Sequence, residues 1–188
     1  MKKHLEISPE AANAELARRE LARRHFKDFN QYAYDGYKDS WHIDLLCDAL
    51  ERVYRGEIRF LIVEMPPRHS KSLNVSQLFP AGVVGQDADT PIIVASYSGD
   101  LATDHGRETR NLINSRRYQN VFKTRLAADS DAKGKWNTAR IVDGQLKLAK
   151  GAYNALGVGG SATGKGAKYF IVDDPFKDRK EADSQLIR

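Results

Sequence analysis

The sequence predicts an α/β domain with a largely parallel sheet flanked by helices. Short apolar runs of buried-strand length alternate along the chain with stretches of helical composition, and this order is typical of parallel sheets with crossover helices. The 188 residues are enough for one domain with a buried core. With 41% hydrophobic and 29% charged residues, the composition excludes a disordered or membrane-embedded chain.

Two helices are expected before the first strand. Residues 9–34 lack glycine and internal proline, and they begin with Pro9 directly after Ser8, a typical N-cap. Residues 41–54 carry apolar side chains at helical spacing, and a glycine follows them as a stop signal. We therefore expect residues 1–40 to form an N-terminal helical segment and residues 41–188 to form the main domain.

The strands of the main domain are expected where the hydrophobic pattern becomes short and continuous. These runs are 58–65 (IRFLIVEM), 91–96 (PIIVAS) and 168–173 (KYFIVD). Helices are expected after the first two strands, at 71–79 and 101–115. The Asp143-Gly144 pair is a strong hairpin signal, so residues 136–156 are expected to form two short strands joined by this turn.

Positive charge is concentrated in one part of the chain. The net charge is +5, but residues 107–150 contain 11 Lys and Arg against 4 Asp and Glu, a net of +7. Such a stretch can face a polyanion, or it can be the solvated face of a helix. The candidate contacts are Arg107, Arg110, Arg116, Arg117, Lys123 and Arg125.

The remaining composition favours a soluble protein of the cytoplasm. The single cysteine, Cys47, excludes an internal disulfide framework and suits a reducing compartment. The chain has no apolar run of the roughly 18 residues that a membrane span requires. Its N-terminus becomes polar before a signal-peptide core could form. We therefore expect no membrane association.

Two glycine-rich patterns resemble phosphate-binding loops but have the wrong context. Residues 159–165 (GGSATGK) and 157–162 match the spacing of such loops, yet a strand and not a helix follows them. The better candidate is PPRHSKS at residues 66–72, which lies between an expected strand and an expected helix. Lys71 supplies an ammonium for phosphates and Ser72 a hydroxyl for a metal. The alternative is a proline turn that leads into an ordinary helix.

Two adjacent acids at the end of the last expected strand provide a second half for this site. Asp173 and Asp174 follow four apolar residues. Adjacent carboxylates at a buried strand end repel each other, and a cation is the usual reason for them to be there. Nucleotide hydrolases need one carboxylate for the Mg²⁺ shell and another to orient or deprotonate water. The alternative is an Asp-rich turn before Pro175.

Four separated motifs give the chain a family resemblance. MPPRHSKS, ASYSGDLATDHGRETRNLINS, GVGGSATGKGAKYFIVDDP and KDRKEADS resemble, in the same order, the N-terminal ATPase region of tailed-phage terminase large subunits. The resemblance extends from about Trp41 to the C-terminus. It implies a P-loop NTPase fold of the additional-strand class, with ATP and Mg²⁺ as cofactors.

The resemblance also implies roles for individual residues. Lys71 and Ser72 match the Walker A lysine and hydroxyl, and Asp173 matches the Walker B metal ligand. Asp174 matches the catalytic acid, although many members have Glu there. Arg68 matches the loop arginine that stabilises the transferred phosphate. The remaining candidates are Pro67, His69 and Ser70 in the nucleotide loop, Trp41 and His42 as the adenine-contacting motif, and Arg107, Arg110 and Lys165 for phosphate or DNA.

Two departures from the family pattern affect the expected activity. Ser70 stands where members commonly have glycine, which is expected to reduce nucleotide affinity or turnover. The chain ends about 14 residues after Asp174, so the ATPase domain is expected to be incomplete at its C-terminus, and the nuclease domain of the family to be absent.

The expected function is therefore that of an ATP hydrolase that drives packaging of double-stranded viral DNA into the procapsid. The implied partners are double-stranded DNA, the portal protein and the small terminase subunit. The implied assembly is a homo-oligomeric ring in the host cytoplasm. Two alternatives remain: a superfamily-2-type helicase ATPase, and a non-catalytic remnant that binds only DNA or assembly partners.

Overall fold

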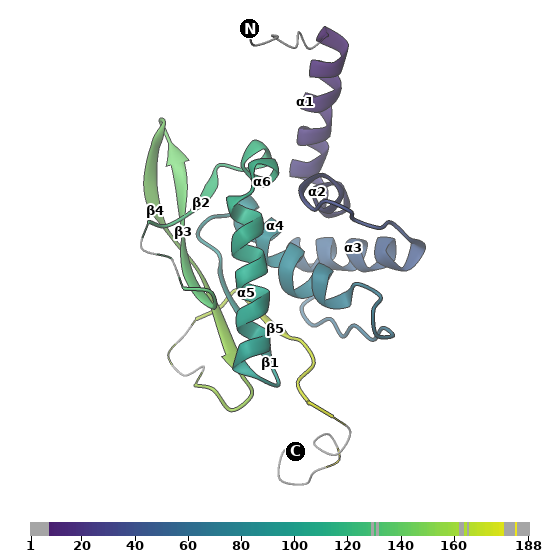
Figure 1. Ribbon diagram of the computed structural model, residues 1–188, viewed down its shortest axis with the longest axis vertical. Helices are drawn as coiled ribbons and strands as arrows, with labels where there is room; N and C mark the ends of the chain where they lie inside the picture. Colours follow the sequence, from purple (N-terminus) through teal and green to yellow (C-terminus); the bar gives the residue numbers. More distant parts are fainter. Residues whose placement is uncertain are drawn as a thin grey trace, which may run out of the picture.

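The computed structural model describes residues 8–128, 130, 132–161, 164, 166–178 and 183. In this part of the chain, helices flank a single five-stranded sheet, as the sequence predicts (Figure 1), but the elements do not alternate, because the last four strands follow one another after the last helix. The helices are α1 (Pro9–Arg24), α2 (Phe26–Ala33), α3 (Trp41–Tyr54), η1 (Leu73–Leu78), α4 (Phe79–Gln86), α5 (Gly99–Asn114) and α6 (Arg116–Val121). The strands are β1 (Pro91–Ser96), β2 (Thr124–Leu126), β3 (Lys135–Val142), β4 (Gln145–Gly157) and β5 (Tyr169–Val172).

The sheet is mixed, so the prediction of a largely parallel sheet is wrong. Its strand order is β2-β3-β4-β1-β5. β1 is parallel to β4 and β5, whereas β3 is antiparallel to both β2 and β4. Asp143 (φ 53°) and Gly144 (φ 76°) form the predicted two-residue turn. Because such a turn reverses the chain at once, the two strands that it joins must be antiparallel.

The strand predicted at residues 58–65 does not form. No strand is assigned to these residues, and Phe60 and Ile62 are 85% and 86% exposed. Residues 59–63 of this segment line a groove together with residues 168–172, which include β5. However, no backbone hydrogen-bond ladder joins the two segments. An apolar run of strand length favours burial, yet a strand also requires a paired neighbour.

The helix predicted at residues 9–34 is two helices. Ser8 caps α1 as expected, since its hydroxyl accepts the amide of Ala11. His25 has an extended backbone, and this break separates α1 from α2. The break allows α2 to bury Phe29 in the core, where its ring contacts the rings of Tyr118 and Phe122.

The predicted helix after PPRHSKS is confirmed, and it continues to Gln86 with an unusual first part. Residues 73–78 form the π-helix η1, in which the amide of Phe79 bonds to the carbonyl of Asn74. Pro80 is the second residue after η1. Because proline cannot donate a backbone hydrogen bond and its ring crowds the carbonyl four residues earlier, a widened turn before it relieves that crowding.

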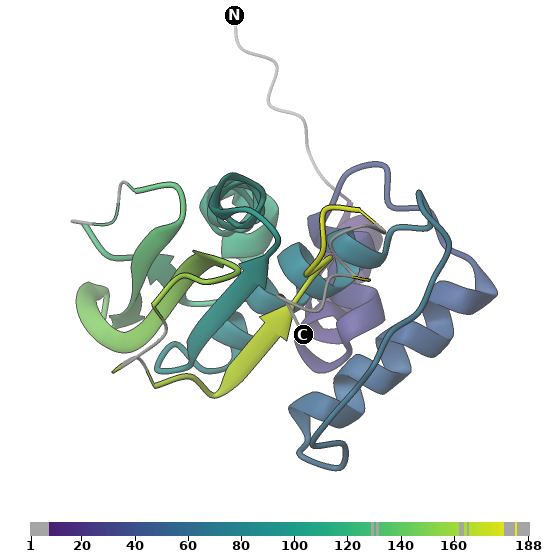
Figure 2. The same cartoon turned by 90° about the horizontal axis from the view of Figure 1, so that it is seen from below.

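Helix α5 covers one face of the sheet (Figure 2). Trp136 of β3 and Tyr153 of β4 stack with ring centroids 4.9 Å apart, and the indole of Trp136 donates to the carbonyl of Gly106 in α5. The core also holds Ile92 and Val94 of β1. This packing fixes α5 against the sheet that carries the predicted site at the ends of β1 and β5.

The close approach of α5 to the sheet predicts a large effect for a small substitution at Gly106. A β-carbon there would lie 2.8 Å from the Lys133 carbonyl oxygen and 2.8 Å from the Tyr153 ring. We expect Gly106→Ala to lower the free energy of unfolding by about 2 kcal/mol, because the added methyl overpacks the interface. Urea unfolding followed by circular dichroism measures this.

Gly99→Ala in the same helix is the matched control. The nearest atom to a β-carbon at Gly99 is 3.9 Å away, which is an ordinary contact. We expect its free energy of unfolding to equal or exceed that of the wild type. Equal losses for the two variants would contradict the packing assigned to Gly106.

Candidate functional site

The predicted phosphate loop and the predicted pair of acids lie at one cleft. Residues 65–73 and Asp174 line a cleft of about 360 Å³. β5 ends immediately before Asp173, whose amide donates to the carbonyl of Ala95 in β1. The amide of Tyr97 in turn donates to the carbonyl of Asp174. The cleft therefore lies beyond the carboxyl ends of two parallel strands, a common place for ligands in α/β proteins.

Lys71 contacts both acids, although 103 positions of sequence separate it from Asp174. Its Nζ lies 3.1 Å from Asp173 Oδ1 and 2.5 Å from Asp174 Oδ1. Burial alone would lower the pKa of Lys71, but hydrogen bonds to Asp174 and Asp173 outweigh it and raise that pKa. The ammonium is therefore charged at neutral pH and faces two carboxylates.

The two acids differ in their surroundings. The Asp173 side chain is 3% exposed, whereas that of Asp174 is 56% exposed. Burial would raise the pKa of Asp173, but hydrogen bonds from Ser72, Ser76 and Lys71 outweigh it and lower that pKa. Ser76 donates to Asp173 Oδ2 at 2.8 Å. Asp173 is thus a fixed carboxylate, while Asp174 is open to the cleft and to solvent.

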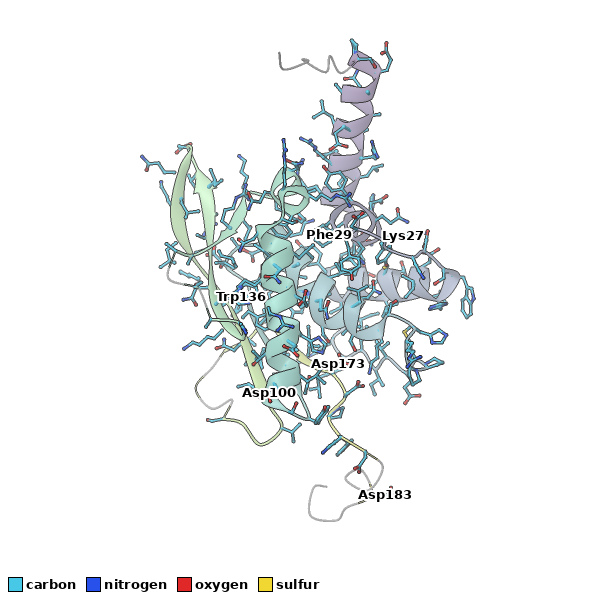
Figure 3. All side chains as sticks on the ribbon, in the orientation of Figure 1. Lys27, Phe29, Asp100, Trp136, Asp173 and Asp183 are labelled. Atoms are coloured by element: carbon cyan, nitrogen blue, oxygen red, sulfur yellow. The ribbon has the colours of Figure 1, made fainter. Side chains whose placement is uncertain are left out.

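A histidine of α5 completes the surroundings of Asp173. His105 Nε2 lies 3.4 Å from Asp173 Oδ2, although it makes no hydrogen bond within the described part of the chain. Its Nδ1 lies 3.2 Å from the amide nitrogen of Gln77 in η1. Burial lowers the pKa of His105. Figure 3 shows Asp173 beside the lower half of α5, with Trp136 on the other side of the helix.

The backbone of the loop is held in a left-handed conformation at residues other than glycine. Arg68 has φ 65° and Ser70 has φ 61°, and Asp174 across the cleft has φ 46°. Each such conformation costs about 1–2 kcal/mol and persists only where its surroundings enforce it. At Ser70 they do, because its carbonyl accepts both the backbone amide and the side-chain amide of Asn74.

Asn74 belongs to a buried polar cluster that joins this loop to the N-terminal helices. Its side-chain oxygen accepts hydrogen bonds from Asn30 of α2 at 3.1 Å and from Tyr37 at 2.9 Å. Cys47 of α3 lies 3.6 Å from the nitrogen of Asn30. Because buried polar groups need partners, this cluster fixes the helix that follows the loop.

The predicted adenine-contacting motif lies next to the loop. His42, at the start of α3, has its ring 5.5 Å from the ring of His69 and 5.7 Å from that of Trp41. His69 donates from Nδ1 to the carbonyl of Pro67. Trp41 is exposed. These aromatic rings therefore form a row that extends from the loop to the surface.

Several cations of the predicted basic patch have partners within the protein. Arg107 pairs with Asp104 and Glu108 of its own helix, and Arg117 pairs with Asp35. Arg125 donates to three backbone carbonyls. Arg116 and Lys123 are exposed. The alternative of a solvated helix face thus stays open, and Lys165 lies outside the described residues.

Three residues at the site were missed by the sequence analysis. Ser76 follows Ser72 by one helical turn, and this spacing was an available signal. His105 lies within a polar helix and Asn74 within a short apolar segment. Neither position has a sequence signal, because only the folded chain brings it to the site.

A comparison with known families identifies the chain. The family model described as terminase large subunit, T4likevirus-type, N-terminal, matches residues 62–188. The chain belongs to this terminase family. No curated protein and no solved structure matches it.

Membership of the terminase family gives the chain a phage DNA-packaging role. The matched segment contains Arg68, Lys71, Asp173 and Asp174 but not Trp41, which precedes it. His42 likewise precedes the matched segment, whereas His69, the third ring of the row, lies within it. In the described part of this chain, no helix has both the length and the apolar character to span a bilayer.

Proposed function

We propose that this chain is the ATPase module of a terminase large subunit, built on a P-loop fold. The single observation that carries the proposal is the contact of Lys71 with both Asp173 and Asp174 at the cleft. An ammonium from a loop before a helix, and two carboxylates after a strand, are the two halves of a phosphoryl-transfer site. The family match supports the same conclusion, since large terminase subunits are in general ATPases.

The residues at the cleft fit MgATP. A hydroxyl and an ionised carboxylate are the oxygen ligands that Mg²⁺ accepts, usually together with phosphate oxygens. Ser72 and Asp173 would hold the cation, and Lys71 with the backbone of residues 67–72 would hold the phosphates. Trp41, His42 and His69 offer aromatic faces for the base. Bound Mg²⁺ would neutralise charge on the phosphates during transfer.

The residues of the chain have separable roles in this proposal. Asp174 is exposed to the cleft and orients or deprotonates the attacking water. Lys71 stabilises negative charge on the transferred phosphate, and Arg68 does so from the same loop. Asp173 remains ionised because its hydrogen bonds lower its pKa. When nucleotide binds, Lys71 must divide its contacts between the phosphates and the two acids.

The wider setting follows from the family. We propose that hydrolysis drives double-stranded DNA into the procapsid, with the portal protein and the small terminase subunit as partners and a ring of copies in the host cytoplasm. The division into residues 1–40 and 41–188 stays a prediction. A superfamily-2-type helicase would share this chemistry and would unwind DNA. No specific observation favours the helicase, and none favours a non-catalytic remnant.

Asp174 provides a direct test of the proposal. We expect the wild-type chain to release phosphate from ATP in Mg²⁺, and Asp174→Asn to release it about 100-fold more slowly, because a positioned base contributes on the order of 100-fold or more. A coupled phosphate-release assay measures both rates. Binding of a fluorescent ATP analogue should change little, since the Asp174 side chain positions water in this proposal.

Asp100→Asn is the matched control, because Asp100 is an exposed aspartate in the first turn of α5. Its phosphate release should equal that of the wild type. A wild-type rate no higher than the rate without protein would refute the ATPase proposal for this chain. Equal losses for Asp174→Asn and Asp100→Asn would refute the role of Asp174.

A further inference from the structure

His105 stands out among the buried polar groups of the protein. Its side chain is 8% exposed and its Nε2 has no hydrogen-bond partner within the described part of the chain, although Asp173 Oδ2 is 3.4 Å away. Buried polar atoms are usually paired. An unpaired nitrogen beside a buried carboxylate therefore suggests a functional reason for its position.

The neighbours of His105 determine which of its nitrogens carries the proton. The side-chain nitrogen of Gln77 lies 3.2 Å from His105 Nδ1. An amide nitrogen can only donate, so Nδ1 accepts, and the proton of the neutral ring is on Nε2. Nε2 lies 3.4 Å from Asp173 Oδ2. The hydrogen bond made by one ring nitrogen of a histidine usually determines whether the other nitrogen carries a proton.

The backbone around His105 leaves it little freedom to move. The hydroxyl of Thr109 donates to the carbonyl of His105 at 2.9 Å and lies 3.4 Å from the carbonyl of Gln77. The next residue, Gly106, is in close contact with β4, as described above. His105 therefore holds a fixed place between η1 and the end of β5.

We infer that His105 is a positioning residue that orients the Asp173 carboxylate for Mg²⁺, with Gln77 holding its ring. The inference rests on the proposed function. With Ser76, His105 occupies the Oδ2 side of the carboxylate, while Lys71 occupies Oδ1. Helix α5 is thereby coupled to the metal ligand, so displacement of the helix would change Mg²⁺ affinity without any contact between α5 and the nucleotide.

The test measures how Mg²⁺ strengthens binding of methylanthraniloyl-ATP, a fluorescent ATP analogue, to the whole chain. Mg²⁺ is titrated into the protein with the analogue, and the midpoint is read from fluorescence. We expect His105→Phe to raise this midpoint about tenfold, because residues that orient metal ligands contribute about 10–100-fold to metal affinity. Analogue affinity in EDTA should not change. His105→Gln, whose amide can donate from the place of Nε2, should stay close to wild type.

The outcomes separate this inference from the proposed function. If the wild type binds the analogue and responds to Mg²⁺ but His105→Phe has the same midpoint, the inference alone is overturned. If His105→Phe and His105→Gln raise the Mg²⁺ midpoint equally, packing of the ring and not orientation of the carboxylate is responsible, and the inference is again overturned. A wild type that does not bind the analogue, or binds it without any effect of Mg²⁺, overturns the proposed function and the inference with it.

A second measurement needs neither nucleotide nor a variant at His105. Nitrogen NMR of the imidazole reports the tautomer directly. We expect the Nε2–H form in the wild type, and a mixture of tautomers in Gln77→Leu, which removes the donor to Nδ1. An Nδ1–H tautomer in the wild type would overturn the inference, even if His105→Phe did not fold.

Discussion

Lys71→Ala is expected to reduce phosphate release from ATP on the order of 1000-fold. The ammonium contacts both acids of the cleft, and removal of one preorganised charge or donor at a transferring group typically costs about 100–1000-fold. The fluorescent ATP analogue should also bind more weakly, since the same charge contacts phosphates before and during transfer. Phosphate release and analogue binding measure the two effects.

Lys168→Ala is the matched control for this result. Lys168 directly precedes β5, lies 3.9 Å from Asp87 and sits over the ring of Tyr169. It is therefore also a lysine near an acid, but it is exposed and lies away from the cleft. Its hydrolysis rate should equal that of the wild type. Circular dichroism must show that Lys71→Ala is folded, because its loss leaves a buried carboxylate with one partner fewer. Equal rates for the wild type and Lys71→Ala would remove the catalytic role.

Asp173→Asn is the second change with an expected effect on the order of 1000-fold, since a Mg²⁺ ligand supports several kcal/mol of charge stabilisation in phosphoryl transfer. The amide keeps the shape and one oxygen but loses the negative charge. Mg²⁺ should then no longer strengthen binding of the ATP analogue. The hydrolysis rate at increasing Mg²⁺ concentration measures the loss of activity. Fluorescence titration measures the effect of Mg²⁺ on binding of the analogue.

Asp89→Asn is the control for Asp173→Asn. The Asp89 carboxylate accepts the backbone amide of Lys150 and pairs with Arg140, and these contacts lower its pKa although burial would raise it. Its substitution should weaken the β3–β4 region and leave hydrolysis unchanged. If Asp173→Asn responded to Mg²⁺ as the wild type does, the assignment of Asp173 as a metal ligand would be wrong.

The sequence predicted most elements because each has a local signal. The helix at 41–54, the strands at 91–96 and 168–173 and the turn at Asp143-Gly144 are confirmed. The prediction of a largely parallel sheet was wrong, although β1 and β5 are parallel, because apolar runs carry no information about the direction of the other strands. The turn itself did carry that information, since a two-residue connection permits only an antiparallel pair. The absent strand at 58–65 has a different reason, because strand formation depends on a partner that hydrophobicity does not specify.

The site was predictable to the extent that its chemistry lies in short motifs. Lys71, Ser72 and the pair of acids are recognisable by residue type and by their place at a strand end or helix start, and the structure brings them to one cleft. His105 and Asn74 were not predictable in this way. Each contributes through one side chain on a helix that packs beside the site, and the packing that brings it there is a property of the whole fold.

The left-handed backbone at Arg68, Ser70 and Asp174 has a consequence for how this protein tolerates change. Each conformation is less favourable than an ordinary one by about 1–2 kcal/mol, and native proteins have only about 5–15 kcal/mol of net stability in total. A site with this geometry therefore lowers the net free energy of unfolding, and fewer destabilising substitutions elsewhere can be tolerated. Variants selected for robustness should accumulate glycine at these positions, and those selected for turnover should not.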